Sequence, residues 1–312
     1  MKKLFLLAAS AMMILASCSK TEVVYQDQDP QEIGFFSIVK KQTKAAIPDD
    51  EFTHTNMVVA ASISGTNGAI TEGEYFGKTE FTKNGGVFTG GKYWPIQPAT
   101  LDFLAVAPEV EDQVETTFPS GAASATVVVT DNETNQHDVM YAEGEGTKTA
   151  GYAPESVSMA FNHALAWVNF TFAGNNSNIT ITDVAVKASY NGTLTVTNGD
   201  VISTSWTDNE EAQSISVPAE DLTINPAAQA AQPYGTAGLL VVPNTGVNFV
   251  ITYSVTDTDQ VSHVYKYTYP LTEQWAAGKK YTYNVTMNVN EIEITPSVTS
   301  WGEGNTPGVN IN

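Results

Sequence analysis

The stretch VSMAFNHALAWVNFTF, residues 157–172, contains two runs of alternating apolar side chains that are out of phase with each other. The apolar positions are odd-numbered in the first run and even-numbered in the second: Val157, Met159 and Phe161, then Val168, Phe170 and Phe172. Alternation with a period of two predicts β-strands, and a shift of one residue turns every side chain to the opposite face. The chain must therefore break or bulge between the runs, at the segment HALAW, residues 163–167.

The same alternation recurs along the chain and predicts an all-β protein. It is clearest in two stretches near the C-terminus, with apolar or aromatic residues at Tyr265, Tyr267, Tyr269, Tyr281, Tyr283, Val285, Met287 and Val289. Asn-Gly pairs at residues 191–192 and 198–199 are tight-turn signals that flank an expected strand at residues 193–197. Many short strands at this spacing predict an antiparallel sandwich or barrel.

The length of the chain predicts two domains. A single β-sandwich commonly needs about 100 residues, and the chain has 312. The best candidate for a boundary is the phase break, which follows the loop GEGTKTAGYAPES. We therefore expect two tandem antiparallel β-sandwich domains, at residues 33–156 and 157–312.

The only cysteine, Cys18, lies at the end of an apolar N-terminal run. Lys2 and Lys3 precede that run, which is shorter than the about 20 residues a membrane-spanning helix needs. This pattern predicts a secretory signal peptide at residues 1–17 and a polar tether at residues 18–32. The residues LASC resemble the bacterial lipobox, at which signal peptidase II cuts before a cysteine that becomes acylated. We expect Cys18 to carry lipid, including palmitate, and to hold the chain at the outer membrane; the alternative is an ordinary signal peptide with an accidental cysteine.

Charge and composition exclude several functions. The formal net charge is −20, and all 14 basic residues are lysines. Nucleic-acid binding needs a basic patch, so we expect no nucleic-acid partner. With Cys18 as the only thiol, disulfides, zinc-thiolate sites and cysteine catalysis are excluded from the rest of the chain. We expect no cofactor and no metal site.

No group of residues has the pattern of a catalytic centre. The four histidines lack zinc-ligand spacing, and the pair His137-Asp138 has no nucleophile motif to serve. His163 is expected to be a hydrogen-bonded structural residue, and Asp257-Thr258-Asp259 to form a hairpin turn rather than a calcium loop. The tryptophans are expected in the core, although exposed aromatic rings could instead bind glycans: Trp94, Trp167, Trp206, Trp275 and Trp301. We expect no enzyme activity.

The stretch EIGFFSIVKKQTKAAIPDD joins a short apolar strand to a basic segment. The expected first strand, residues 33–39, has apolar groups on both faces: Ile33, Phe35, Phe36, Ile38 and Val39. Lys40, Lys41 and Lys44 follow in residues 40–46, which lack structural periodicity. A buried strand before an exposed basic hinge is a suitable substrate for a lysine-specific or trypsin-like protease. The alternative is an ordinary first strand followed by a loop.

Several motifs together resemble the fimbrillin family of Bacteroidales, the subunits of type V pili and their anchor or tip relatives. They are Cys18 with its lipobox, IGFFSI followed by TKA, YWPIQPATLDFLAVAP, HDVMYAEG, MAFNHALAWVNFTF and WAAGKKYTYNVTMNV. The resemblance implies two transthyretin-like β-sandwiches and a subunit of a cell-surface fimbrium that supports adhesion. It also implies export as a lipoprotein, proteolytic removal of the first strand, and filling of the vacated groove by a strand from another pilin subunit.

The resemblance leaves three points open. Related pilins are commonly cut after arginine, which this chain lacks, so the candidate cleavage sites are Lys44, then Lys41 and Lys40. The C-terminal stretch containing Ile292, Ile294 and Val298 could supply the donor strand or be the last strand of the second sandwich. The chain could also be an uncut anchor or tip protein, or a surface-anchored glycan-binding lipoprotein.

Overall fold

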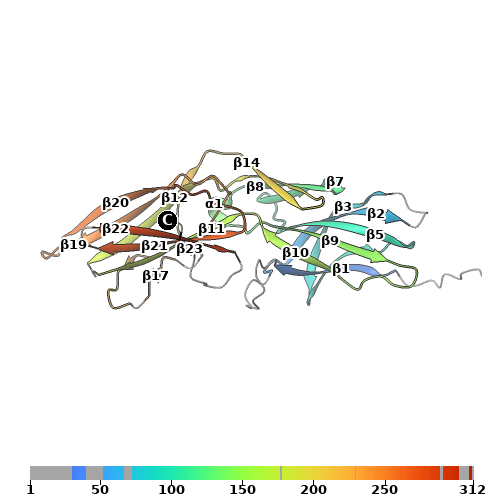
Figure 1. Ribbon diagram of the computed structural model, residues 1–312, viewed down its shortest axis with the longest axis horizontal. Coiled ribbons are helices and arrows are strands. Elements are labelled where there is room, and N and C mark those ends of the chain that lie inside the picture. The colour runs from blue at the N-terminus through green and yellow to red at the C-terminus, as the bar shows by residue number, and fades with distance from the viewer. Residues whose placement is uncertain are drawn as a thin grey trace, which may run out of the picture.

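The computed structural model describes residues 30–39, 52–66, 72–175, 178–228, 230–235, 237–288, 291–301 and 309–310. Strands make up almost all of their regular structure, and α1 (Asn132–Asn135) is the one helix in these ranges. The protein is therefore all-β, as the alternating side chains predict. The strands form an elongated molecule with the N-terminal strands at one end and β19–β22 at the other (Figure 1).

Seven strands close into a barrel in the order β1-β10-β9-β5-β2-β3-β4. Their bounds are β1 (Glu32–Val39), β2 (Asn56–Thr66), β3 (Gly73–Asn84), β4 (Val87–Tyr93), β5 (Ala99–Ala107), β9 (Met140–Lys148) and β10 (Val157–His163). Inside the barrel lies the first hydrophobic core, which includes Phe81, Phe88 and Phe103. Closure leaves this sheet without a free edge as long as β1 remains in place.

The C-terminal half contains two sheets around a second core. One has the order β17-β11-β21-β22-β23, with β18 also paired to β11, and the other has the order β15-β12-β19-β20, with β16 paired to β12. The bounds in the first sheet are β11 (Ala166–Gly174), β17 (Gln232–Pro233), β18 (Leu239–Val241), β21 (Lys279–Asn288), β22 (Glu291–Ser300) and β23 (Val309–Asn310). Those in the second are β12 (Ile179–Ala188), β15 (Gln213–Ser216), β16 (Leu222–Thr223), β19 (Asn248–Thr256) and β20 (Ser262–Pro270).

A four-stranded sheet joins the two halves of the chain. Its order is β14-β13-β8-β6, and β13 pairs with β8 over six residues. The bounds are β6 (Val114–Thr117), β8 (Ser124–Val129), β13 (Gly192–Thr197) and β14 (Ser203–Asp208), with β7 (Pro119–Ala122) in the connection between β6 and β8. A third hydrophobic cluster under this sheet contains residues of both halves, such as Val127 and Leu194. The two halves are thus connected by strand pairing as well as by the chain.

The phase break separates two cores. Side chains of β10 that point inward, such as Met159 and Phe161, belong to the barrel core, whereas those of β11, such as Val168 and Phe170, belong to the second core. Ala164 and Leu165 lie between the strands and are buried in the third cluster. The expected boundary at residue 157 is therefore too early, because β10 completes the barrel and the chain changes sheets only after it.

Two ladders differ from the expected antiparallel arrangement. β1 pairs with β10 in parallel, and β11 pairs with β21 in parallel over eight residues. Parallel strands need a long crossover connection, and in both cases many other strands lie between the partners in the sequence. Local alternation contains no information about the direction of a distant partner.

One of the two turn signals is confirmed and one is corrected. Residues 198–202 connect β13 to β14, which pair as a hairpin. Gly192, in contrast, is already part of β13 and pairs with both neighbouring strands. The Asn191-Gly192 pair marks the point where the chain passes from one sheet to another, and the Oδ1 atom of Asn191 accepts a hydrogen bond from the backbone of Asn132 (3.0 Å).

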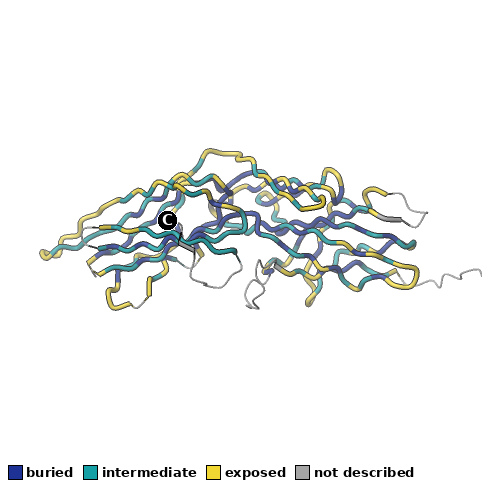
Figure 2. Tube along the Cα trace, viewed as in Figure 1, coloured by how far each residue is buried: buried dark blue, intermediate teal, exposed yellow. Residues whose placement is uncertain are grey.

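Buried residues run along the centres of both halves, and exposed residues lie at the loops, at strand ends and along outer strands such as β20 (Figure 2). Within the described ranges, no helix has the length and apolar character needed to cross a membrane.

Candidate functional site

The first strand, β1, occupies a slot between β4 and β10, and its pairing changes partner along its length. Residues 32–35 pair with β4 in antiparallel fashion, and residues 35–39 pair with β10 in parallel. Within β1, Phe35 is the only residue with a register partner on both sides, Phe88 in β4 and Val157 in β10. Removing β1 would open the barrel and leave two strand edges without partners.

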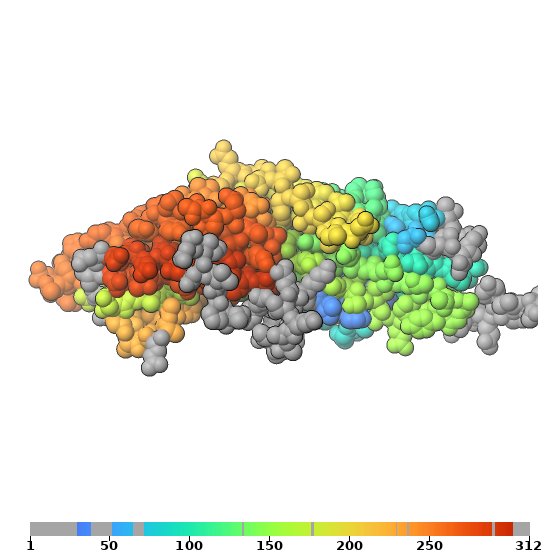
Figure 3. All heavy atoms as spheres, viewed as in Figure 1, coloured from blue at the N-terminus to red at the C-terminus, as the bar shows by residue number. Residues whose placement is uncertain are grey.

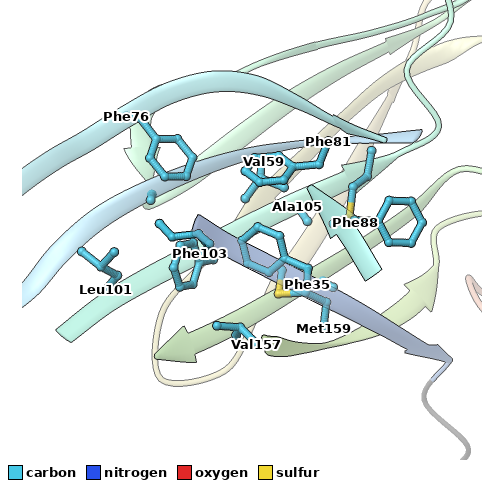
Figure 4. Close-up of a cluster of buried hydrophobic side chains, with 14 of the residues drawn as sticks. Phe35, Val59, Phe76, Phe81, Phe88, Leu101, Phe103, Ala105, Val157 and Met159 are labelled. Carbon is cyan, nitrogen blue, oxygen red and sulfur yellow. The ribbon is translucent and has the colours of Figure 1, made fainter. Parts of the chain in front are cut away.

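The inward face of β1 contributes two large side chains to the barrel core. Ile33 and Phe35 are completely buried. The ring of Phe35 makes edge contacts with Phe81 and Phe103, at centroid distances of 4.9 Å and 5.0 Å. Figure 4 shows Phe35 among these rings, with Met159 beside it. The slot is thus lined by aromatic side chains that β1 covers.

Polar contacts hold the N-terminal end of β1. The backbone N–H of Gly91 donates to the carboxylate of Glu32 (2.9 Å), and the backbone N–H of Trp94 donates to the carbonyl of Gln31 (2.9 Å). The side-chain amide of Gln31 donates to the carbonyl of Ala153 (3.2 Å). These bonds connect β1 to both walls of the slot and fix its position along the strand axis.

The outward face of β1 is only partly covered. Phe36 is 39% exposed and Ile38 is 49% exposed, so part of the strand reaches the surface, where it appears blue in Figure 3. The sequence predicts apolar groups on both faces, whereas the structure fully buries only Ile33 and Phe35, which lie on one face. Closure of the barrel explains the difference, because only the inner face of a barrel strand points into the core.

Five residues of the predicted sites are not described by the structure, in whole or in their side chains. Cys18, Lys40, Lys41 and Lys44 belong to ranges that the structure does not describe, and β1 contains Val39 without a description of its side chain. Lipid attachment at Cys18 and cleavage after a lysine remain predictions. The described strand ends one residue before the first of these lysines.

The C-terminal strand β22 is part of the second sandwich. It pairs with β21 over ten residues, and Ile292, Ile294 and Val298 pack against the second core. These three side chains are half-buried rather than enclosed. In the single chain, this stretch therefore pairs as a strand of its own sheet, and a role as donor strand stays a prediction.

Three of the four histidines lie near Asp138, and they differ in their hydrogen-bond partners. His163 Nδ1 is 3.0 Å from both carboxylate oxygens of Asp138, whereas His137 Nε2 bonds to Gln113 Oε1. His163 is thus a hydrogen-bonded structural residue, as expected. Burial lowers the pKa of His54 and of His137 below the usual value for histidine. Among the residues described, no group of three His, Cys, Asp or Glu side chains is placed to hold a metal ion.

The tryptophans do not form an exposed aromatic platform. Trp94 and Trp275 are buried, and the other three are half-buried. Trp301 stacks on His163 at a centroid distance of 3.9 Å and also contacts Trp167. This arrangement agrees with packing and gives no support to glycan stacking.

The segment Asp257-Thr258-Asp259 forms a turn, as expected. In it the Asp257 carboxylate accepts backbone hydrogen bonds within the connection between β19 and β20.

The sequence did not identify the residues that line the slot. Phe81, Phe88, Phe103 and Met159 come from four different strands and meet β1 only in the folded barrel. Their large apolar side chains within predicted strands indicate that each faces a core. It does not indicate that they face the first strand, because that contact joins residues far apart in the chain.

Comparisons with known proteins agree with this architecture. A fimbrial protein of Bacteroides vulgatus has a similar fold, with a TM-score of 0.62 at 14% identity, and the match covers 87% of this chain and 99% of that one. A putative cell adhesion protein of Bacteroides ovatus gives a TM-score of 0.55 at 15% identity over 89% of this chain and 100% of that one. Another, of Bacteroides uniformis, gives 0.51 at 18% identity over 87% and 98%. No curated protein matches the sequence.

A sequence model of the fimbrillin-like family matches residues 43–301, which is most of the chain. The match begins after β1 and ends at Trp301, just past β22. It therefore includes the second core, the joining sheet and every strand of the barrel except the first. By this match the chain belongs to the fimbrillin-like family.

Proposed function

We propose that this protein is a structural subunit of a cell-surface pilus that assembles by strand exchange. It is exported as a lipoprotein through Cys18 and then cut by a surface protease in residues 40–46, most readily after Lys44. Loss of β1 opens its slot, and a strand of a neighbouring subunit fills it. The assembled fibre supports adhesion.

The observation that carries this proposal is the position of β1. It is the first of the described strands, it completes a closed barrel, and the family match begins only after it, at Thr43. After a cut in residues 40–46, β1 can leave without breaking any later connection of the chain. The exposed edges of β4 and β10 would then need new partners, because unpaired strand edges readily pair with another strand.

The energetics favour exchange over an empty slot. Burial of Ile33 and Phe35 stabilises the barrel by about 1.5–3 kcal/mol each, or about 3–6 kcal/mol together, before entropy costs. A vacated slot loses this contribution and exposes the aromatic lining. A donor strand that restores the same contacts would therefore bind tightly, and hydrogen bonds along both edges would add to the affinity.

Relatives support the location and the role. The solved structures with a similar fold are described as a fimbrial protein and as putative cell adhesion proteins. Such proteins act at the cell surface, which fits the expected lipoprotein signal at the N-terminus of this chain.

The test is to sequence the N-terminus of protein taken from the surface of the native host and to run it on a denaturing gel without heating. We expect a mature N-terminus at Ala45 and a ladder of oligomers. The triple variant Lys40→Ala, Lys41→Ala, Lys44→Ala should remain uncut and form no ladder, whereas Lys266→Ala, an exposed lysine on β20, should behave as wild type.

If surface protein begins only at acylated Cys18, the stalk-subunit function is wrong. The chain would then be an uncut anchor or tip protein of the same kind of fibre. Normal ladders from the triple variant would instead place the cleavage outside the lysine segment.

A further inference from the structure

Gly34, in the middle of the paired part of β1, is enclosed by the walls of the slot. It is buried, and its residue partner across the ladder is Thr89 of β4. A Cβ atom built on Gly34 would lie 2.8 Å from Cγ1 of Val87 and 3.1 Å from the carbonyl oxygen of Glu155. Real Cβ contacts essentially never fall below 3.0 Å, so a side chain at this position forces Val87 or β1 to move.

The two obstacles come from opposite sides of the slot. Val87 begins β4, and Glu155 precedes β10 in the chain. The carbonyl of Glu155 is backbone and cannot rotate away as a side chain can. Gly34 therefore lies between a side chain of β4 and a backbone carbonyl that precedes β10.

Neighbouring contacts prevent β1 from sliding to avoid this point. Glu32 is bound by the backbone of Gly91, and Phe35 fills the space between Phe81 and Phe103. A shift by two residues would remove both contacts, and a shift by one residue would turn the apolar face outward. The register of any strand in the slot is thus fixed on both sides of Gly34.

We propose that the slot selects its strand by requiring glycine at this position. The strand it accepts has a glycine between two large apolar residues, as in Ile33-Gly34-Phe35, with the glycine against the side chain of Val87 and the apolar residues pointing into the barrel. This inference rests on the proposed strand exchange and adds a sequence requirement for the donor strand of the neighbouring subunit.

The requirement acts through sterics rather than affinity for the glycine itself. Overpacking in a closely packed site typically costs about 1–3 kcal/mol, which corresponds to a roughly 5- to 150-fold loss of binding. A strand with alanine or a larger residue at this position pays that cost, whereas its apolar residues bind as before. Strands with similar hydrophobicity but no glycine would therefore be rejected.

The experiment uses the full chain with a site for a sequence-specific protease inserted between Lys44 and Ala45. After cleavage, β1 stays in the slot by non-covalent contacts alone and can be displaced. Fluorescent peptides with the sequence of residues 30–39 are added, and their incorporation is followed by anisotropy and native gels. Three peptides are compared: wild type, Gly34→Ala, and the control Ser37→Ala.

We expect the wild-type and Ser37→Ala peptides to bind equally and the Gly34→Ala peptide to bind at least fivefold more weakly. In a chain with Val87→Ala, the Gly34→Ala peptide should recover part of its binding, because the nearer obstacle is removed and the Glu155 carbonyl remains. Equal binding of all three peptides to the wild-type chain would overturn the glycine requirement alone. Failure of the wild-type peptide to enter the slot would overturn the strand exchange as well.

A second measurement needs no cleavage. In the intact chain, Gly34→Ala should lower the urea midpoint of unfolding, and adding Val87→Ala should restore part of the loss relative to Val87→Ala alone. The matched control is Gly77→Ala in β3, where a Cβ would meet only the end of the flexible Glu74 side chain, at 3.3 Å. A glycine-to-alanine change in compatible backbone is neutral or stabilising. A neutral effect of Gly34→Ala would contradict the enclosure on which the proposal depends.

Discussion

Replacing Phe35 by alanine should lower the free energy of unfolding by about 3–5 kcal/mol, the range for removal of a fully buried phenylalanine. Phe35 has no exposed surface, and its ring makes edge contacts with Phe81 and Phe103 at centroid distances of 4.9 Å and 5.0 Å. Alanine would leave a cavity between rings that come from different strands. Because those strands are held by the closed barrel, the cavity cannot easily collapse.

The matched control is the next residue, Phe36→Ala. It removes the same side chain from the same strand, but Phe36 is 39% exposed and points outward. Loss of its buried part should cost only about 1–2 kcal/mol, without a cavity term. The two variants therefore separate the burial of the inward face from the general preference of a strand for aromatic residues.

The assay is urea denaturation of the intact chain, followed by circular dichroism. In the chain cut after Lys44, the same substitution should weaken retention of β1 by roughly 100- to 4,000-fold, because each 1.4 kcal/mol is a factor of ten. Equal losses for Phe35→Ala and Phe36→Ala would refute the reasoning, since they would mean that the inner face of β1 contributes no more to the barrel than the outer face does.

Two further predictions concern the Trp275–Tyr283 hydrogen bond in the second core and the burial of His54. Tyr283→Phe should lower the free energy of unfolding by about 1–3 kcal/mol, because the buried Trp275 Nε1 would lose its hydrogen-bond acceptor, the Tyr283 hydroxyl at 2.9 Å. Urea denaturation measures this loss. An unchanged free energy of unfolding would mean that another acceptor replaces the hydroxyl. Burial holds the pKa of His54 below the usual 6.5, so the unfolded chain takes up the proton first. Stability contributed by neutral His54 is present above pH 6.5 and is lost as the pH falls below it toward the lowered pKa. His54→Gln should flatten the pH dependence of the urea midpoint between pH 7 and 5, and an unchanged pH dependence in this variant would contradict the effect of burial on His54.

Several features of the fold follow from residues that are close together in the sequence. Alternation along single strands predicted the all-β class, and the change of phase between Phe161 and Val168 predicted a break that the structure has at Ala164 and Leu165. The apolar run from Ile33 predicted a strand at residues 33–39, and the observed strand β1 begins one residue earlier, at Glu32. These predictions succeed because the two-residue period of a strand is a property of the backbone and is visible within a few residues.

The partners of the strands could not be obtained in the same way. Nothing near residue 157 indicates that β10 pairs in parallel with β1 and completes the barrel, and the expected domain boundary was misplaced for that reason. Nothing near Gly192 indicates that β13 joins β8 of the other half. Such pairings depend on contacts between residues more than sixty positions apart.

In the candidate site, too, some features follow from the sequence and others only from the tertiary structure. The sequence by itself determined that the chain begins with an apolar strand followed by lysines, and that Cys18 is the single thiol. Only the tertiary structure decided that Ile33 and Phe35 are enclosed, that Phe36 and Ile38 are not, and that Gly34 lies between two walls. The physical reason is that alternation along one strand determines to which side of the strand each residue points. Burial, in contrast, depends on which other strands pack against that side.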